Sequence, residues 1–154
     1  MIYLIEKHLW REGSETQVRS TIGEVALRLE KVSTTFSTSY VVYDRYHVEL
    51  GQIKKVGFGK SYEITYDNKL IGRVELKKKW FRKRYVITSA KGQAFSIRGK
   101  IESWEYNIYQ GMKKLAQVHH KLGSSSKTYG FETINEEYRY LLLCGALALH
   151  IIHH

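Results

Sequence analysis

"EYRYLLLCGALALHIIHH", residues 137–154, closes the chain and decides its fold. From Tyr140 to Ile152 this segment is apolar on nearly every side, which is typical of a helix surrounded by protein. A helix of these 13 residues spans about 20 Å, whereas a bilayer core of about 30 Å needs roughly 20 apolar residues. The segment is therefore too short to cross a membrane, and we predict a buried helix over about residues 135–152. Insertion into lipid and binding to a partner protein are the alternatives.

The residues around this segment fit a helix. Asn135 can cap its N-terminus, and Glu136 and Glu137 would then lie in the first turn, where the helix dipole favours carboxylates. Gly145 and Ala146 are small and lie near the middle, as does Ala148. We expect them to let the surrounding chain approach the helix closely.

Upstream of the helix, the sequence repeats. Tyrosines recur at positions 40, 62, 85, 106 and 129, at spacings of 22, 23, 21 and 23 residues; the first four open similar phrases and the phrase at 129 is a weaker fifth. A further unit built on "ETQVRS" precedes them from Glu15. In "YEITYDNKLIGRVELKKK" (62–79), apolar and polar residues alternate on both sides of "DNK" (67–69), which suits a tight turn. Later turns are expected at "AKG" (90–92) and "QG" (110–111). Each unit therefore predicts a β-hairpin followed by a looser connection.

Five or six such hairpins give ten to twelve antiparallel strands, and a sheet of that size must close or split to protect its edges. The complete absence of proline suits continuous strand pairing. A barrel of about twelve strands has an interior that strand side chains alone do not fill, and a helix about 10 Å across would fill it. We predict a mainly β, antiparallel closed barrel (about residues 1–134) wrapped around the buried C-terminal α-helix (about 135–152), as one domain over residues 1–154.

The composition limits the partners and the location. Lys and Arg outnumber Asp and Glu by 25 to 15, so the formal net charge is +10 and the protein favours polyanions. The single cysteine, Cys144, excludes an internal disulfide and fits a reducing compartment. The opening "MIYLIEK" (1–7) lacks the basic and long apolar regions of a signal peptide. We expect a cytoplasmic protein, with a peripheral position at the inner face of the membrane as an option.

The chain resembles the tubby C-terminal-like superfamily, in particular its small bacterial LURP-one-related members. The resemblance rests on the serial hairpins ("YEITYDNKLIGRVELKKKWF", "YNIYQGMKKLAQVHHK") and on the ending "TYGFETINEEYRYLLLCGALALHII". It covers essentially the whole chain and implies a twelve-stranded barrel around a central C-terminal helix. Larger relatives include the phosphoinositide-binding tubby proteins and the phospholipid scramblases. At His150 the resemblance implies a carboxylate instead, so no role is carried over to that position.

The strongest candidate site is "KKKWFRKR" (77–84), which we place in the connection between two hairpins. Clustered cations beside aromatic rings suit phosphate headgroups at a membrane interface, and they could also follow a nucleic-acid backbone while Trp80 stacks on a base. The alternative is a solvated connection in which Trp80 or Phe81 folds into the barrel end. "IKKVGFGK" (53–60) and "MKKL" (112–115) could extend the cationic surface. The predicted ligand-binding residues are Lys77, Lys78, Lys79, Trp80, Arg82, Lys83 and Arg84.

Other motifs predict little chemistry. "VGFGKS" (56–61) is not a phosphate-binding loop, because the required earlier glycine is replaced by Lys54. His119 and His120 are expected on opposite faces of a strand, where they could not easily share a metal. His150 and His154 have helical spacing but no evident third ligand, and Cys144 has no adjacent base. We therefore predict no catalytic residues, no metal, no cofactor and no enzymatic activity.

The sequence thus predicts a non-catalytic binding module of the tubby-like, LURP-one-related type. The favoured partner is an anionic phospholipid surface or another polyanion, bound through the basic and aromatic residues. Nucleic acid is the second candidate. A structural domain for an acidic protein partner, with no small ligand, is the third.

Overall fold

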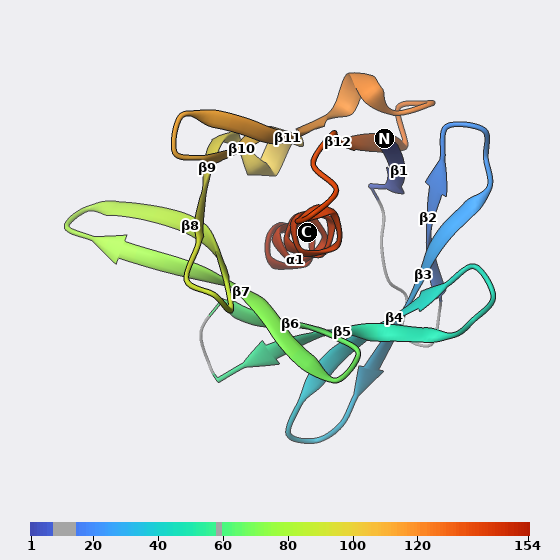
Figure 1. Ribbon diagram of the computed structural model, residues 1–154, viewed down its shortest axis with the longest axis horizontal. Helices are drawn as coiled ribbons and strands as arrows, with labels where there is room; N and C mark the ends of the chain where they lie inside the picture. Colours follow the sequence, from blue (N-terminus) through green and yellow to red (C-terminus); the bar gives the residue numbers. More distant parts are fainter. Residues whose placement is uncertain (8–14, 58–59) are drawn as a thin grey trace.

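The strands of the protein form a closed antiparallel barrel in a computed structural model that describes residues 1–7, 15–57 and 60–154 (Figure 1). Every strand pairs with its neighbours in sequence, and the first strand closes the barrel against the last. The predicted twelve-stranded, mainly β barrel is confirmed. Its strands are β1 (Ile2–Glu6), β2 (Glu15–Ser20), β3 (Val25–Ser33), β4 (Thr38–Asp44), β5 (Glu49–Val56), β6 (Ser61–Tyr66), β7 (Lys69–Lys79), β8 (Arg82–Ser89), β9 (Ala94–Lys100), β10 (Glu105–Gln110), β11 (Lys113–His119) and β12 (Thr128–Thr133).

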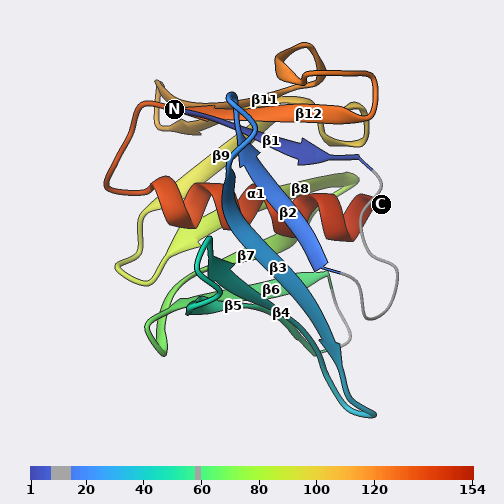
Figure 2. The same cartoon turned by 90° about the vertical axis from the view of Figure 1, so that its right-hand side faces the viewer.

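Among the described residues there is one α-helix, α1 (Arg139–His153), and it lies along the interior of the barrel (Figures 1 and 2). All ten residues from Leu141 to His150 are buried. The prediction of a buried terminal helix is therefore confirmed, and the lipid-inserted alternative is wrong. Two short 3₁₀ helices, η1 (Ile101–Ser103) and η2 (His120–Leu122), lie between strands of the wall.

The tight turns form where the sequence predicts them. Between β6 and β7, Asp67 and Asn68 both adopt positive φ angles, 51° and 61°, as a two-residue hairpin turn requires. The turns at 90–92 and 110–111 contain Gly92 and Gly111, which also have positive φ. The repeating unit is thus a strand, a tight turn and a second strand.

This serial topology gives the barrel two distinct ends. The odd strands end and the even strands begin at the end where α1 terminates, which we call the carboxyl rim; the opposite end, where α1 begins, is the amino rim. Trp104, between η1 and β10, stacks on His154 with ring centroids 4.2 Å apart, so the end of α1 lies at the carboxyl rim. Tyr66, at the β6–β7 turn, packs edge-on against Tyr140 with ring centroids 5.0 Å apart, so the start of α1 lies at the amino rim.

The repeated tyrosines line the inside of the barrel. All five are buried, and they begin even-numbered strands near the carboxyl rim, where they surround the last part of α1: Tyr40, Tyr62, Tyr85, Tyr106 and Tyr129. The helix meets the wall closely at Gly145, where an added Cβ would lie 2.5 Å from Cδ1 of Ile87. The expectation that small residues allow close approach is confirmed at this position.

The helix begins four residues later than predicted. The Asn135 carboxamide oxygen accepts a hydrogen bond from the backbone N–H of Tyr138 at 2.8 Å, which closes a turn ahead of the helix. Glu136 and Glu137 lie in that turn, and α1 starts at Arg139 without a side-chain cap. Asn135 therefore stabilises the approach to the helix rather than its first turn, because its side chain is satisfied locally.

Candidate functional site

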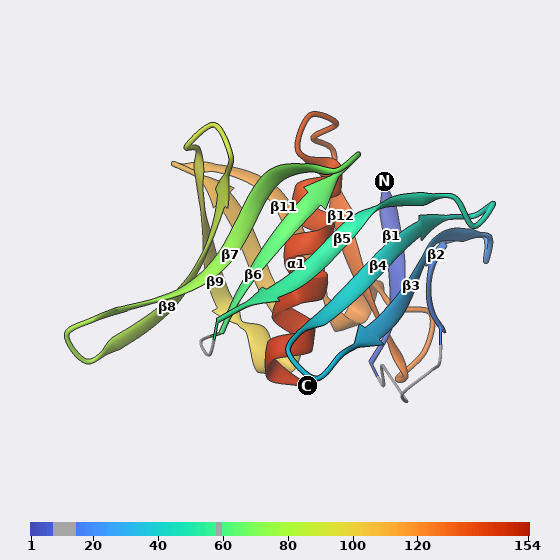
Figure 3. The same cartoon turned by 90° about the horizontal axis from the view of Figure 1, so that it is seen from below.

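The cationic segment of the sequence forms a projecting β-ribbon. β6 pairs with β7 only as far as Val74, and β9 pairs with β8 only over Val86–Thr88. Between those limits, β7 and β8 pair only with each other, and residues 75–85, here called the arm, extend beyond the wall (Figures 1 and 3). We expected a connection between hairpins here; the structure instead continues both strands to a two-residue turn, Trp80–Phe81.

Two aromatic rings occupy the tip of the arm. Trp80 is 90% exposed and Phe81 is fully exposed. The alternative in which one of them folds into the barrel end is therefore wrong. Adjacent, fully hydrated rings are unfavourable in water, and they are typical of a surface that contacts another phase or partner.

The arm places like charges opposite one another. Its last three cross-strand pairs are Lys77 with Arg84, Lys78 with Lys83, and Lys79 with Arg82. The side chain of Lys79 lies outside the described residues, so that pair rests on the backbone register. Like charges in direct opposition destabilise a sheet, and an isolated two-stranded hairpin is only marginally stable. An anion bound to the arm would therefore stabilise it.

A cleft opens at the base of the arm, at the carboxyl rim. It has a volume of about 660 Å³ and lies between the strands β6 to β9 and the end of α1. Leu76 and Tyr85, which face each other across β7 and β8, line it together with Ile97 and Ile101. The polar residues lining it are Lys60, Ser61, Lys78, Lys83, Arg84, Glu102 and His153.

His153 connects the cleft to the helix. Its ring packs edge-on against Tyr85 at 5.1 Å, and its Nε2 atom is buried with no hydrogen-bond partner among the described residues. Burial lowers the pKa of the His153 ring, and the positive charge of Lys60 lowers it further. The ring is therefore a neutral, polar group at the inner end of a cationic cleft.

The other cationic segments divide between the two rims. Lys60, from "IKKVGFGK", lines the cleft at the carboxyl rim, while Phe58 and Gly59 lie outside the described residues. "MKKL" cannot extend this surface, because Met112 lies in the β10–β11 turn at the amino rim. The expectation for "MKKL" was wrong because paired lysines occur both beside turns at the amino rim and beside connections at the carboxyl rim. Phe36, at the tip between β3 and β4, is 97% exposed and shares the carboxyl rim with the arm.

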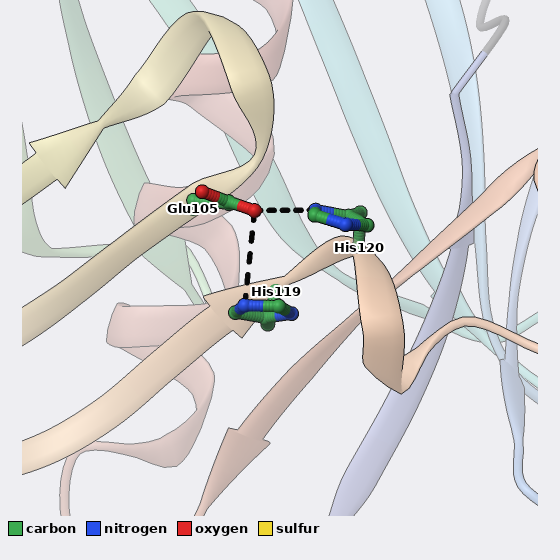
Figure 4. Close-up of side chains that lie close together, drawn as sticks. All are labelled: Glu105, His119 and His120. Carbon is green, nitrogen blue, oxygen red and sulfur yellow. Dashed lines mark ion pairs between the residues drawn. The ribbon is translucent and has the colours of Figure 1, made fainter.

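A cluster of Glu105, His119 and His120 also lies near the carboxyl rim (Figure 4). The expectation that the two histidines face opposite ways is wrong, because β11 ends at His119 and η2 begins at His120. Their rings stack at 4.7 Å, and Glu105 lies 2.8 Å from Nδ1 of His120 and 3.8 Å from Nε2 of His119. Sequence reasoning missed this grouping because the strand end could not be located to one residue.

The hydrogen bonds of this cluster favour a structural role. Nδ1 of His119 accepts the backbone N–H of Lys121 at 3.0 Å, so the neutral ring carries its proton on Nε2. A histidine that binds a metal normally donates a hydrogen bond from its other nitrogen, which is the opposite arrangement. The cluster therefore holds η2 against β10 in this structure.

Cys144 offers little reactivity. Its side chain is completely buried in α1, and burial raises the pKa of the thiol to about 12. Tyr140, the neighbouring polar side chain on the helix, donates its hydroxyl hydrogen to the backbone oxygen of Thr65 at 3.0 Å. The buried thiol predicted from the sequence is confirmed.

Comparisons with known proteins agree with this fold. The family model described as LURP-one-related matches residues 1–149. A crystal structure of a protein from Arabidopsis thaliana superposes with a TM-score of 0.66 over 97% of this chain and 91% of that chain, at 10% sequence identity, which shows a shared fold. No curated protein matches the chain. Within the described residues, no helix has the length and apolar character needed to span a bilayer. The chain belongs to the LURP-one-related family.

Proposed function

We propose that this member of the LURP-one-related family is a non-catalytic module that docks on anionic phospholipid membranes through its arm. The single observation behind this proposal is the composition and shape of the arm: a free ribbon with six cations below two exposed rings. The cations are Lys77, Lys78, Lys79, Arg82, Lys83 and Arg84.

The energies are sufficient for reversible docking. Each basic residue near an anionic membrane contributes about 1 kcal/mol, so several acting together hold a domain at the surface under physiological salt. Trp80 would lie at the level of the headgroups and Phe81 among the upper acyl chains, because aromatic rings are favoured at that interface. Binding also places lipid phosphates between the opposed cations of the arm.

The exposed rings at the carboxyl rim are consistent with binding to a flat surface such as a membrane. Phe36 adds a third exposed ring to Trp80 and Phe81, and it is carried on a separate hairpin that points toward the same end of the barrel (Figure 2). Two hairpin tips with exposed rings suit contact with an extended surface. The sequence suggested both parts of this proposal, namely the binding residues of the arm and the peripheral position at the membrane.

Nucleic acid is the second candidate, and the form of the arm favours it specifically. Two-stranded ribbons can enter a DNA groove, and apolar residues at the tip can insert between base steps. Binding of this kind would fall steeply with salt for DNA or RNA and would show little preference for vesicles.

Co-sedimentation with phosphatidylcholine vesicles, with and without phosphatidylserine, tests the proposal. We expect the protein to sediment only with the anionic vesicles at low salt. Replacing the six arm cations with glutamine should weaken binding by more than about 100-fold, given the energy per residue. A matched control with six glutamines at the amino rim should bind like the wild type; its positions are Arg45, Lys69, Lys91, Lys113, Lys114 and Arg139.

A further variant, Trp80→Ser with Phe81→Ser, separates insertion of the rings from attraction of the charges. We expect it to retain salt-sensitive binding and to lose the salt-resistant part. Equal loss in the arm and amino-rim variants would contradict the proposal, as would failure to bind anionic vesicles at low salt. Tight, salt-dependent binding to single-stranded DNA by the same six residues would support the second candidate instead. Circular dichroism spectra would verify that each variant is folded.

A further inference from the structure

We propose that the cleft at the base of the arm binds one phosphate monoester bearing an apolar chain, as in a single molecule of phosphatidic acid; this inference rests on the proposed membrane docking. Lys78, Lys83 and Arg84 of the arm line the cleft, whereas Lys77, Arg82 and the two rings at the tip do not. The cleft would hold one molecule, whereas the arm would contact many headgroups at once.

The first argument is the position of its cations in the strand alternation. In β7 and β8 the side chains of Val74 and Tyr85 face the barrel interior and are buried. Counting two residues at a time toward the carboxyl rim leads to Lys78 and Lys83, which pair directly across the strands and both line the cleft. Both lysines are exposed at the cleft, and like charges in direct opposition destabilise a strand pair. An anion between the two ammonium groups would offset that repulsion.

The remaining charges reinforce this preference. Lys60 and Arg84 also line the cleft, and Glu102 is the one carboxylate among its described lining residues. Four cations against one carboxylate leave a net charge of +3, which suits a phosphate monoester with up to two negative charges. Arg84 adds a planar guanidinium, which can donate two parallel hydrogen bonds to phosphate oxygens.

The second argument is the unpartnered nitrogen of His153. Its Nε2 atom is buried at the edge of the cleft, while the ring is fixed by its contact with Tyr85. A buried polar atom without a hydrogen bond is costly, so a ligand oxygen at hydrogen-bond distance would remove that cost. The neutral ring can donate an Nε2 hydrogen to such an oxygen.

The third argument is the apolar floor. Leu76, Ile97 and Ile101 are half-buried in the cleft, next to the buried ring of Tyr85. Cations at the entrance above an apolar floor match an amphiphile with a charged head and the beginning of a chain. Inorganic phosphate or a water-soluble phosphate ester would leave this floor unused.

The wall is open where such a molecule would enter. β8 and β9 stop pairing at Val86 and Ser96, whereas β9 stays paired with β10 as far as Lys100. The two strands therefore separate toward the carboxyl rim, and the cleft lies between them. Its volume of about 660 Å³ is within the range of small-molecule sites, roughly 300–1,000 Å³. Because the arm begins here, docking through the arm would bring the cleft to the membrane surface.

Isothermal titration calorimetry with dihexanoyl phosphatidic acid, kept below its critical micelle concentration, tests the cleft without a membrane. We expect saturable binding of one molecule per chain. Glycerol 3-phosphate and inorganic phosphate should bind at least about tenfold more weakly, because they cannot use the apolar floor. Dihexanoyl phosphatidylcholine should also bind at least about tenfold more weakly, because its headgroup has no net charge.

The variants compare the cleft with a distant part of the surface. Lys78→Gln with Lys83→Gln removes the cleft pair and should weaken binding by about tenfold or more. The matched control, Lys113→Gln with Lys114→Gln, removes two charges from the amino rim and should stay within about twofold of the wild type. His153→Phe keeps a ring against Tyr85 but deletes Nε2, and we expect a loss of several-fold.

Each outcome bears on a particular part of the proposal. Absence of one-to-one binding, or equal losses from the cleft pair and the amino-rim pair, would overturn the cleft assignment, even if vesicle binding remained intact. Equal affinity for glycerol 3-phosphate would overturn the lipid as the source of the phosphate. One-to-one binding of phosphatidic acid without any vesicle binding would support the cleft and contradict docking by the arm.

Discussion

The hydroxyl group of Tyr129 lies 2.7 Å from Nδ1 of His150, and both side chains are buried inside the barrel. On its other side, Nε2 of His150 lies 3.0 Å from the backbone oxygen of Lys7. A carbonyl oxygen only accepts, so Nε2 carries the proton and the Tyr129 hydroxyl donates to Nδ1 of the neutral ring. One residue of α1 thereby joins β12 to the end of β1, the two strands that close the barrel.

This relationship predicts a specific stability loss. Tyr129→Phe would leave Nδ1 of His150 without the donated hydrogen, which should cost about 1–3 kcal/mol in the free energy of unfolding. Urea denaturation followed by far-ultraviolet circular dichroism measures it. Tyr46→Phe, at an exposed position, is the control and should change stability by less than about 0.5 kcal/mol. Similar values for both variants would show that the buried hydrogen bond contributes nothing.

Two glycines should differ sharply in their tolerance of a methyl group. A Cβ at Gly51 would lie 1.9 Å from the backbone oxygen of Thr65, whereas one at Gly145 would meet the Cδ1 end of the Ile87 side chain at 2.5 Å. A side-chain end can rotate away more easily than the backbone of a paired strand. We expect Gly51→Ala to lower the melting temperature far more than Gly145→Ala, with overpacking costs of about 1–3 kcal/mol or more. A larger effect at Gly145 would contradict this order.

Cys144 should react only when the barrel unfolds. Because burial raises the pKa of its thiol to about 12, almost no thiolate is present at neutral pH, and the side chain has no contact with solvent. Labelling with dithionitrobenzoic acid should be very slow in native buffer and complete within the dead time in concentrated urea. The labelling rate at intermediate urea should follow the unfolded fraction. Rapid labelling of the native protein would contradict the buried position of α1.

Acid should weaken the fold through the end of the helix. Burial lowers the pKa of both His153 and His154 in the folded protein, so the unfolded chain binds protons more readily at these positions. Their contribution to stability is fully present above the unfolded value of about 6.5 and is lost as the pH falls through the lower, folded values. Urea midpoints at pH 7 and at about pH 5 measure this effect. His153→Phe should show a smaller difference between the two conditions, and an unchanged difference would exclude this residue as a source.

The Glu105 cluster gives a prediction for nuclear magnetic resonance. With Nδ1 of His119 accepting from Lys121, the neutral ring must carry its hydrogen on Nε2. Nitrogen-15 chemical shifts of the ring at mildly alkaline pH distinguish the two tautomers. Observation of the Nδ1-protonated form would contradict the structural role and would leave Nε2 available for a metal.

The hydrophobic pattern of the sequence predicted most of the fold. The period-two alternation and the turn residues, such as Asp67 and Asn68, located the hairpins, and the unbroken apolar run located the helix. Both signals are local. Each extends over many residues, so a single ambiguous residue does not erase it. The start of α1 was misplaced because Asn135 forms a local turn that competes with a helix cap.

Only part of the candidate site could be predicted from the sequence. The cations of 77–84 were identifiable from their density, but they occupy both faces of the strands, so no alternation revealed a ribbon. The cleft could not be derived, because Lys60, Ile97, Glu102 and His153 come from separate elements that only the closed barrel brings together. The Glu105–His119 pair was likewise set by strand register, which the sequence leaves open.

Closure of this barrel joins elements that the ribosome delivers far apart in time. β1 emerges before the other strands of the barrel, yet its partner β12 and the helix that fills the interior follow all the intervening strands. Until they appear, the nascent sheet has two unsatisfied edges and a bare apolar inner surface. Closure of the barrel therefore waits for β12 and α1, and until they appear the apolar strands are suited to binding by a chaperone.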